Sequence, residues 1–339
     1  MKRPVISILN SSTFGKHFAA HMETLHAFAD IQHIDVPSDI DADALAAHIK
    51  NSDGIIASVT PKIPRRTLEQ CKNLVLLVRH GIGCDNVDLE AATELGIMVS
   101  RVKGIVEKEA VAEYAVSLLM AASRQVVQGA QAVRNSAWAT RSGMIGMELK
   151  GKTIGIIGLG NIGSRSSEIL SKGFGANVVA SDPYIDKSRF AEFGAKEVPL
   201  DELISTSSAI LFHCPATEET KRMLGTAQFA SMQKGAVLVN TCRGELVDED
   251  ALFEALQTGP LGAYATDVVE GEPIDSSHRL TKLDNVIVTP HLGGYSWESL
   301  HGMGQTCVDD SVAVFQKNGV PGEMANPEVL EKANRRVWQ

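Results

Sequence analysis

A glycine-rich turn in the middle of the chain constrains the fold more than any other feature. Residues 153–170, TIGIIGLGNIGSRSSEIL, read as an apolar strand, a turn with glycines at 158, 160 and 163, and a helix. In such a unit the glycines permit a tight turn, close approach of the backbone to a pyrophosphate, and close packing of helix on strand. The phosphates of a bound dinucleotide lie at the N-terminus of the helix, where free backbone N–H groups favour anions. The residues before 153 must then form a separate part of the molecule.

An acidic residue follows the turn at the spacing that a dinucleotide site requires. Asp182 ends the next predicted strand, NVVASD, about 20 residues after Gly163. A carboxylate there accepts hydrogen bonds from the adenosine ribose and repels a 2′-phosphate. The pattern therefore predicts NAD, and not NADP, as the cofactor.

Short apolar runs alternate with helical segments along the whole chain, which is typical of buried parallel strands in an α/β fold. We expect strands at residues 4–10, 54–59, 74–81, 153–160, 177–182, 209–215, 236–241, 263–269 and 285–291. The predicted fold class is α/β with doubly wound parallel sheets.

The length favours two lobes, because 339 residues exceed what one hydrophobic core usually serves. Predicted helices at 108–133 and 296–319 are placed to carry the chain between them. We expect a discontinuous substrate-binding domain, residues 1–103 and 293–339, and an NAD-binding domain, residues 104–292. The cleft between the lobes would hold the chemistry.

Composition excludes several classes of function. The formal charge is −9 with no cluster of Lys and Arg, so we expect no nucleic-acid partner. No apolar window approaches the ~18 residues of a membrane span, and the apolar run after MKR is too short for a signal peptide, so we expect a cytoplasmic protein with no membrane contact. The five cysteines form no C-x-x-C pair, which argues against a disulfide framework and against a metal site.

Five ordered motifs carry a resemblance to a known family. They are residues 79–97 (RHGIGCDNVDLEAATELGI), 146–163 (GMELKGKTIGIIGLGNIG), 212–224 (FHCPATEETKRML), 232–252 (MQKGAVLVNTCRGELVDEDAL), and DVVEGEP at 267–273 with NVIVTPHLGG at 285–294. The chain resembles the D-isomer-specific 2-hydroxyacid dehydrogenases, in the branch similar to phosphoglycerate dehydrogenase. The resemblance implies a flavodoxin-like substrate lobe, a Rossmann NAD-binding lobe, a small anionic 2-hydroxy or 2-oxo acid substrate, and a homodimer formed through the NAD-binding domain.

The resemblance also assigns the catalytic residues. Arg243 matches the substrate-binding arginine, Glu272 the supporting carboxylate, and His291 the acid/base. These residue types suit the reduction of a 2-oxo acid, because a planar guanidinium can bind the carboxylate and polarise the adjacent carbonyl. Histidine gives and takes a proton near neutral pH, and a neighbouring carboxylate stabilises its charged form.

The remaining expected site residues fall into two groups. The expected cofactor-binding residues are Gly158, Gly160, Asn161, Ile162, Gly163, Asp182, His213, Pro215, Thr220, Thr241, Cys242, Asp267, Gly293 and Gly294. The expected substrate-binding residues are Arg79, His80, Gly81, Ile82 and Gly83, together with Arg243 and His291.

The sequence leaves the substrate and one alternative function open. Arg79 matches a residue often present in phosphoglycerate dehydrogenases, whereas Ser58 stands where those enzymes tend to carry an arginine. Candidates are therefore 3-phosphoglycerate, hydroxypyruvate or glyoxylate, and lactate-like acids. The alternative is an NAD(H)-sensing, corepressor-like binding protein of the same fold, in which the Arg, Glu and His positions are also occupied. Formate oxidation is disfavoured, because the related formate enzymes carry glutamine where Glu272 stands.

Overall fold

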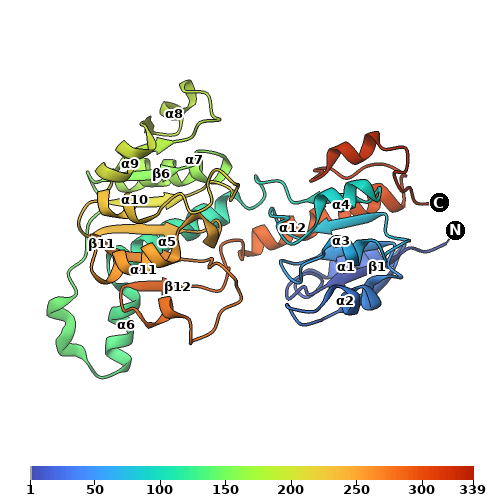
Figure 1. The fold of residues 1–339 in the computed structure, drawn as a ribbon, viewed down its shortest axis with the longest axis horizontal. Helices are drawn as coiled ribbons and strands as arrows, with labels where there is room; N and C mark the ends of the chain where they lie inside the picture. Colours follow the sequence, from blue (N-terminus) through green and yellow to red (C-terminus); the bar gives the residue numbers. More distant parts are fainter. Residues whose placement is uncertain (1) are drawn as a thin grey trace. The chain divides into compact units, whose positions relative to one another are not determined.

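The computed structural model describes residues 2–339, which form two compact units (Figure 1). The first unit holds the chain up to Glu107 together with Tyr295–Gln339, and the second is Lys108–Gly294. The chain leaves the first unit after Glu107, where the expected boundary was 103, and re-enters it at Tyr295, where the expected boundary was 293.

The first unit is built on a five-stranded parallel sheet of order β2-β1-β3-β4-β5. This is the flavodoxin-like order, with its topological switch point between β1 and β3. Its strands are β1 (Val5–Leu9), β2 (Asp30–Ile34), β3 (Gly54–Ala57), β4 (Leu76–Arg79) and β5 (Met98–Arg101). Its helices are α1 (Ala19–His26), α2 (Ala42–Ile49), α3 (Arg65–Leu68), α4 (Leu89–Glu94), α12 (Trp297–Phe315) and the 3₁₀ turn η5 (Pro327–Glu331).

Both faces of this sheet are covered, as its apolar strands β1, β3 and β4 require. Ile6 and Ile8 of β1 pack with α1 and with Val308 and Phe315 of α12. Leu9 lies in the other cluster, with residues of α2, α3 and α4. Helix α12, near the C-terminus, therefore covers a sheet whose first strand lies near the N-terminus.

The second unit is built on a seven-stranded parallel sheet of order β12-β11-β10-β9-β6-β7-β8. Numbered from β6, this is the Rossmann order 3-2-1-4-5-6 with one further strand beside the sixth. Its strands are β6 (Thr153–Ile157), β7 (Asn177–Ser181), β8 (Ala195–Glu197), β9 (Ala209–Phe212), β10 (Ala236–Asn240), β11 (Leu261–Thr266) and β12 (Val286–Val288). The two sheets confirm the α/β class with two doubly wound lobes.

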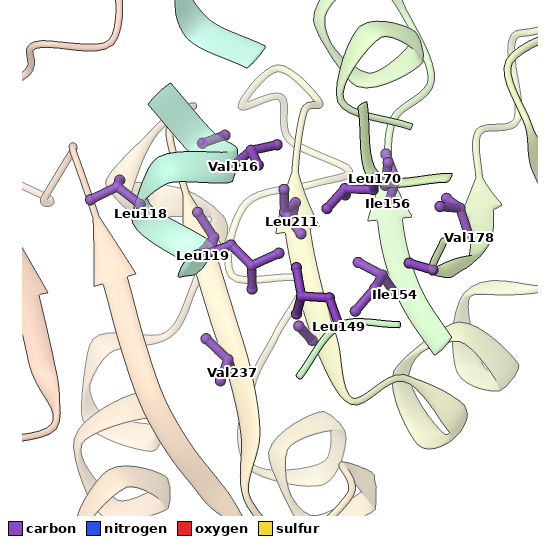
Figure 2. Close-up of a cluster of buried hydrophobic side chains, with 14 of the residues drawn as sticks. Val116, Leu118, Leu119, Leu149, Ile154, Ile156, Leu170, Val178, Leu211 and Val237 are labelled. Atoms are coloured by element: carbon purple, nitrogen blue, oxygen red, sulfur yellow. The ribbon is translucent and has the colours of Figure 1, made fainter. Parts of the chain in front are cut away.

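Helices cover both faces of the larger sheet. They are α5 (Lys108–Ser123), α6 (Val126–Arg134), α7 (Asn161–Glu168), α8 (Ser188–Glu192), α9 (Leu200–Thr206), α10 (Thr226–Ser231) and α11 (Glu249–Gln257), with the short turns η1 (Trp138–Gly143), η2 (Ile169–Gly173), η3 (Gly244–Leu246) and η4 (Arg279–Lys282). Figure 2 shows Leu119 of α5 beside Leu211 of β9, in the same buried cluster as Ile156 of β6. Alternate strand residues such as Ile210 and Leu238 enter a second cluster with α9, α10 and α11.

The expected helix at 108–133 is in fact two helices. Gln125, between α5 and α6, adopts a left-handed backbone with φ of 50°, which a continuous right-handed helix cannot contain. Among residues 2–339, no helix combines the length and apolar character needed to cross a bilayer.

Candidate active site

The glycine turn after β6 has the geometry that its sequence predicts. A Cβ at Gly163 would lie 2.0 Å from the carbonyl oxygen of Gly158, and one at Gly158 would lie 2.6 Å from the carbonyl oxygen of His213. Gly158 also has φ of 90°, a left-handed conformation. These two glycines therefore serve the turn and the close approach of β9 and α7.

The middle glycine serves a different purpose. A Cβ at Gly160 would meet nothing within 4 Å, so the space in front of it is open. Gly160 is the N-cap of α7 and brings no side-chain hydrogen bond to it, which leaves the first N–H groups of the helix available to an anion. Asn161 and Ile162 form the first turn of that helix. The open cradle fits the pyrophosphate of NAD.

Asp182 directly follows β7 and is hydrogen-bonded to the glycine turn. Its Oδ2 accepts from Leu159 N at 2.7 Å, and its Oδ1 accepts from Tyr184 N at 2.9 Å. Each carboxylate oxygen has a second lone pair, so both can still accept from ribose hydroxyls. The carboxylate is thus fastened to the turn after β6, the strand that borders the switch point between β6 and β9, where open α/β sheets bind ligands.

His213, at the end of β9, lies against the same turn. Both of its ring nitrogens are buried without a hydrogen-bond partner, and burial lowers the pKa of His213 to about 3. The ring is therefore neutral at physiological pH, and we find no role for it as a proton donor. Beyond it, Thr220 Oγ1 donates to Pro215 O at 2.7 Å and shapes the loop that follows β9.

Two thiols lie at the ends of neighbouring strands. Cys242 Sγ donates to Phe212 O at 3.0 Å, and burial raises the pKa of Cys242 well above its ordinary value. Burial likewise raises the pKa of Cys214 to about 11. Both thiols are therefore protonated near neutral pH and are poor nucleophiles. Thr241, next to Cys242, has a buried hydroxyl without a partner.

The turn that carries Arg243 is held by a residue that sequence reasoning did not select. Asn240, fully buried at the end of β10, accepts from Cys242 N at 2.9 Å and donates to Arg243 O at 2.7 Å. The signal for it was an asparagine at the end of an otherwise apolar strand, AVLVN. A Cβ at Gly244 would lie 2.1 Å from Glu270 N, so this turn packs directly on the loop after β11.

That loop carries Glu272, which lies beside His291. His291 Nδ1 and Glu272 Oε1 are 2.5 Å apart, and Glu272 Oε2 accepts from Val269 N at 3.3 Å. Both side chains are about one-third exposed, so a ligand can reach them. His291 has φ of 57°, a left-handed backbone uncommon outside glycine, and such conformations cluster at functional sites.

Asp267 holds the loop on which His291 stands. Its Oδ1 accepts from Thr289 Oγ1 at 2.6 Å and Leu292 N at 2.8 Å, and its Oδ2 accepts from Gly293 N at 2.6 Å. Burial raises the pKa of the Asp267 carboxyl against the opposing effect of these bonds. These bonds brace the loop at 289–293. The cofactor contacts expected of Asp267, Gly293 and Gly294 stay predictions.

The loop after β4, in the first unit, was expected to receive a carboxylate. Gly81 N donates to Arg79 O at 2.9 Å, while no hydrogen bond among residues 2–339 uses the N–H groups of Ile82 and Gly83. Those two amides are therefore available to an anionic ligand.

Arg79 and His80 precede that loop and are both buried. Arg79, 5% exposed, donates from Nη1 to His80 O at 2.7 Å, so its guanidinium is turned onto the loop itself. Burial first, then the charges of Arg79 and His21, lower the pKa of His80 to about 4. The substrate contacts expected of these two residues stay predictions.

Within residues 2–339, no group of three or more His, Cys, Asp or Glu side chains is arranged to hold a metal ion. The glycine turn, the carboxylate after β7 and the Rossmann strand order instead define a dinucleotide-binding protein. The model of the D-isomer specific 2-hydroxyacid dehydrogenase NAD-binding domain matches residues 116–293. The chain belongs to the D-isomer-specific 2-hydroxyacid dehydrogenase family, a family of NAD-dependent oxidoreductases.

Individual relatives differ in length and in their named substrates. The chain is 34% identical to a glyoxylate reductase of Aeropyrum pernix over 98% of each protein. It is 36% identical to a D-3-phosphoglycerate dehydrogenase of Archaeoglobus fulgidus, covering 82% of this chain but only 52% of that enzyme. Apo D-lactate dehydrogenase of Escherichia coli superposes with a TM-score of 0.81 at 30% identity, over 95% of this chain and 99% of that one.

Proposed function

We propose that this protein is an NAD-dependent dehydrogenase that interconverts a D-2-hydroxyacid and the corresponding 2-oxo acid. The observation that carries the proposal is the 2.5 Å contact between His291 and Glu272, on a loop that Asp267 clamps at the carboxyl edge of the sheet that holds the glycine turn. A histidine positioned by a carboxylate at this edge is suited to proton transfer beside a bound nicotinamide.

Each residue has a distinct task in the proposed reaction. Bound NADH supplies the hydride that reduces C2 of the oxo acid. Arg243 grips the substrate carboxylate and polarises the C2 carbonyl. In the first unit, the amides of Ile82 and Gly83 are the groups that we assign to carboxylate binding. His291 gives its proton to the C2 oxygen, and Glu272 stabilises the imidazolium and fixes the orientation of the ring. In the oxidative direction His291 takes the proton back.

A substrate panel tests this proposal. Purified protein is mixed with NADH and, separately, with glyoxylate, hydroxypyruvate, pyruvate and 3-phosphohydroxypyruvate, and NADH oxidation is followed by absorbance. We expect turnover of at least one oxo acid and formation of the D-hydroxy product, read by chiral chromatography. Tight NADH binding without turnover of any oxo acid would favour the corepressor-like alternative.

The surface of the second unit supports a homodimer as part of the proposal. Helix α6 has no buried residue, and Figure 1 shows it extending away from the rest of this unit. Trp138 and Ile145, which follow it, are 64% and 82% exposed. Large apolar side chains gathered on one segment are typical of protein–protein contacts. We expect a dimer in light scattering, and a monomer when Trp138→Ser and Ile145→Asp are combined.

A further inference from the structure

A hollow of about 320 Å³ lies at one edge of the first unit and has no role in the reaction proposed above. It is lined by Asn10, Ser11, Ser12, Lys16, Asp35, Val36, Ser38 and Thr60. These residues follow the carboxyl ends of β1, β2 and β3, so the hollow covers the switch point of this sheet, where ligands of such folds bind. Its volume is at the lower end of the range for small-molecule sites.

The wall of this hollow is formed before any ligand binds. Asn10 Nδ2 donates to Val36 O at 2.9 Å and its Oδ1 accepts from Val36 N at 2.8 Å, which fastens the end of β1 to the end of β2. Ser11 Oγ accepts a hydrogen bond from Phe14 N at 3.0 Å, so this hydroxyl oxygen already has a partner within the protein. The wall of the hollow is therefore held in place by hydrogen bonds within the protein.

The remaining groups offer both donors and acceptors. Among residues 2–339, neither Lys16 nor Asp35 forms an ion pair or a side-chain hydrogen bond, and the hydroxyls of Ser38 and Thr60 also have no partner. An ammonium only donates, a carboxylate only accepts, and a hydroxyl does both. A second anionic group on the ligand would meet Asp35 with like charge. A chain of hydroxyl groups can satisfy all four residues, because each hydroxyl donates and accepts.

The hollow lies along the same sheet edge as the loop proposed to bind the substrate carboxylate. That loop follows β4, and β3 and then β1 are the next strands in the sheet. Neighbouring strands are about 4.8 Å apart, so the parts of the hollow that follow β3, β1 and β2 begin about 5, 10 and 14 Å from the loop. Asn86 Nδ2 donates to Ser58 O and to Pro61 O, both at 3.1 Å, and so ties the segment after β4 to the segment after β3.

We propose that this hollow is a subsite for the distal hydroxyl groups of the substrate, so that the preferred oxo acid is a polyhydroxylated 2-oxo acid of five or six carbons. The inference rests on the proposed function, because it places the carboxylate of that substrate at Ile82 and Gly83. Lys16 and Asp35 select for hydroxyl groups, and Ser38 and Thr60 add further hydrogen bonds.

The first arm of the test compares substrates of equal length. The wild-type protein is assayed with NADH and 2-oxo-D-gluconate, with 2-oxohexanoate, which has the same carbon chain without hydroxyls, and with 2-oxoadipate, which ends in a second carboxylate. We expect kcat/KM for the hydroxylated acid to exceed that for each of the others by about tenfold or more, since a site built to bind hydroxyls rejects analogues that lack them.

The second arm removes the charged groups of the hollow. Lys16→Met and Asp35→Asn should each lower the ratio of kcat/KM for 2-oxo-D-gluconate to that for glyoxylate by about tenfold, mainly through KM. Lys50→Met and Asp39→Asn are matched controls, since both side chains are exposed in the same unit and neither lines the hollow. The melting temperature of each variant is measured to exclude loss of folding.

The outcomes separate the two proposals. Reduction of short oxo acids with no preference for the hydroxylated chain, or an unchanged ratio in both hollow variants, would overturn the subsite and leave the dehydrogenase intact. Failure to reduce any oxo acid would overturn both. A preference for 2-oxoadipate would show that the hollow binds an anion, which also contradicts the inference.

Discussion

The imidazole Nδ1 of His291 lies 2.5 Å from Glu272 Oε1, and the other carboxylate oxygen is held by the backbone N–H of Val269. Because Nδ1 is engaged, Nε2 is the ring nitrogen available for the proton transfer proposed above. The carboxylate thus fixes both the orientation of the ring and the position of its proton.

Removing either member of this pair should damage the same step. We expect His291→Ala to lower kcat by about 10² to 10⁴, the usual worth of a positioned acid/base. Glu272→Gln, which keeps the shape of the side chain without its charge, should lower kcat by a factor of about 10 to 10². The double variant should be no slower than His291→Ala alone, because Glu272 acts through His291. Additive losses in steady-state kinetics would contradict this assignment, and NADH affinity serves as the control.

Arg243→Lys should lose far more activity than its retained charge suggests. An ammonium cannot reproduce the two parallel N–H bonds of a guanidinium to a carboxylate. We expect kcat/KM for the oxo acid to fall by about 10² or more, while NADH binding measured by fluorescence stays near the wild-type value. A variant with near-normal turnover would remove Arg243 from the site.

The three glycines should separate stability from cofactor binding. Gly160→Ala adds a methyl group where no protein atom lies within 4 Å, so the melting temperature should stay close to that of the wild type. The same methyl group faces the open cradle, so NADH affinity should fall by about tenfold or more. Gly163→Ala, whose Cβ would clash with Gly158 O, should instead lower the melting temperature. Equal NADH binding by Gly160→Ala and the wild type would show that the pyrophosphate lies elsewhere.

Asp182 should set the choice between the two nicotinamide cofactors. Its carboxylate is fixed beside the glycine turn by Leu159 N and would meet a 2′-phosphate with like charge. We expect kcat/KM to be much higher with NADH than with NADPH. Asp182→Ala should bring the two kcat/KM values closer together. Comparable values for both cofactors in the wild type would contradict the role given to this residue.

Buried His80 should make the protein less stable in acid. The pKa of His80 is about 4 in the folded protein, compared with an ordinary value of 6.5. The neutral ring therefore contributes its full share to the free energy of unfolding above pH 6.5, and this share is lost as pH falls towards 4. Between pH 7.5 and pH 5 this amounts to about 2 kcal/mol. In urea titrations at the two pH values, His80→Gln should lose less stability than the wild type. His48→Gln removes an exposed imidazole of the same unit and is the control.

Most of the strands were predictable because they are buried on both faces. The nine expected apolar runs all contain strands, whereas β2, β5 and β8 were missed. β2, with the sequence DIQHI, and β8, with AKE, lie at sheet edges and carry exposed polar side chains, so neither shows a continuous apolar run. β5, MVSR, forms the other edge of the first sheet, and only its first two residues are apolar.

The residues of the candidate site were selected from the sequence, whereas their supporting contacts were not predictable from it. The glycine turn and Asp182 have a fixed spacing along the chain, and motif positions singled out Arg243, Glu272 and His291. The clamps formed by Asn240 and Asp267 depend on hydrogen bonds to backbone groups of other loops, which residue spacing does not encode. The left-handed backbone of Gln125, which divides the helix at 108–133, has no glycine to announce it.

The interrupted path of the first unit sets an order of events during synthesis. Residues 108–294 leave the ribosome as one continuous segment and hold every strand of their own sheet. The five-stranded sheet, by contrast, is translated early but needs Val308 and Phe315 of α12 to cover Ile6 and Ile8. The second unit can therefore fold while the first still exposes apolar surface, as domains generally fold as units during translation. A chain that ends between residues 294 and 297 would contain the complete NAD-binding unit. Its first unit would lack α12, would leave the apolar side chains of β1 exposed, and would therefore be prone to aggregate.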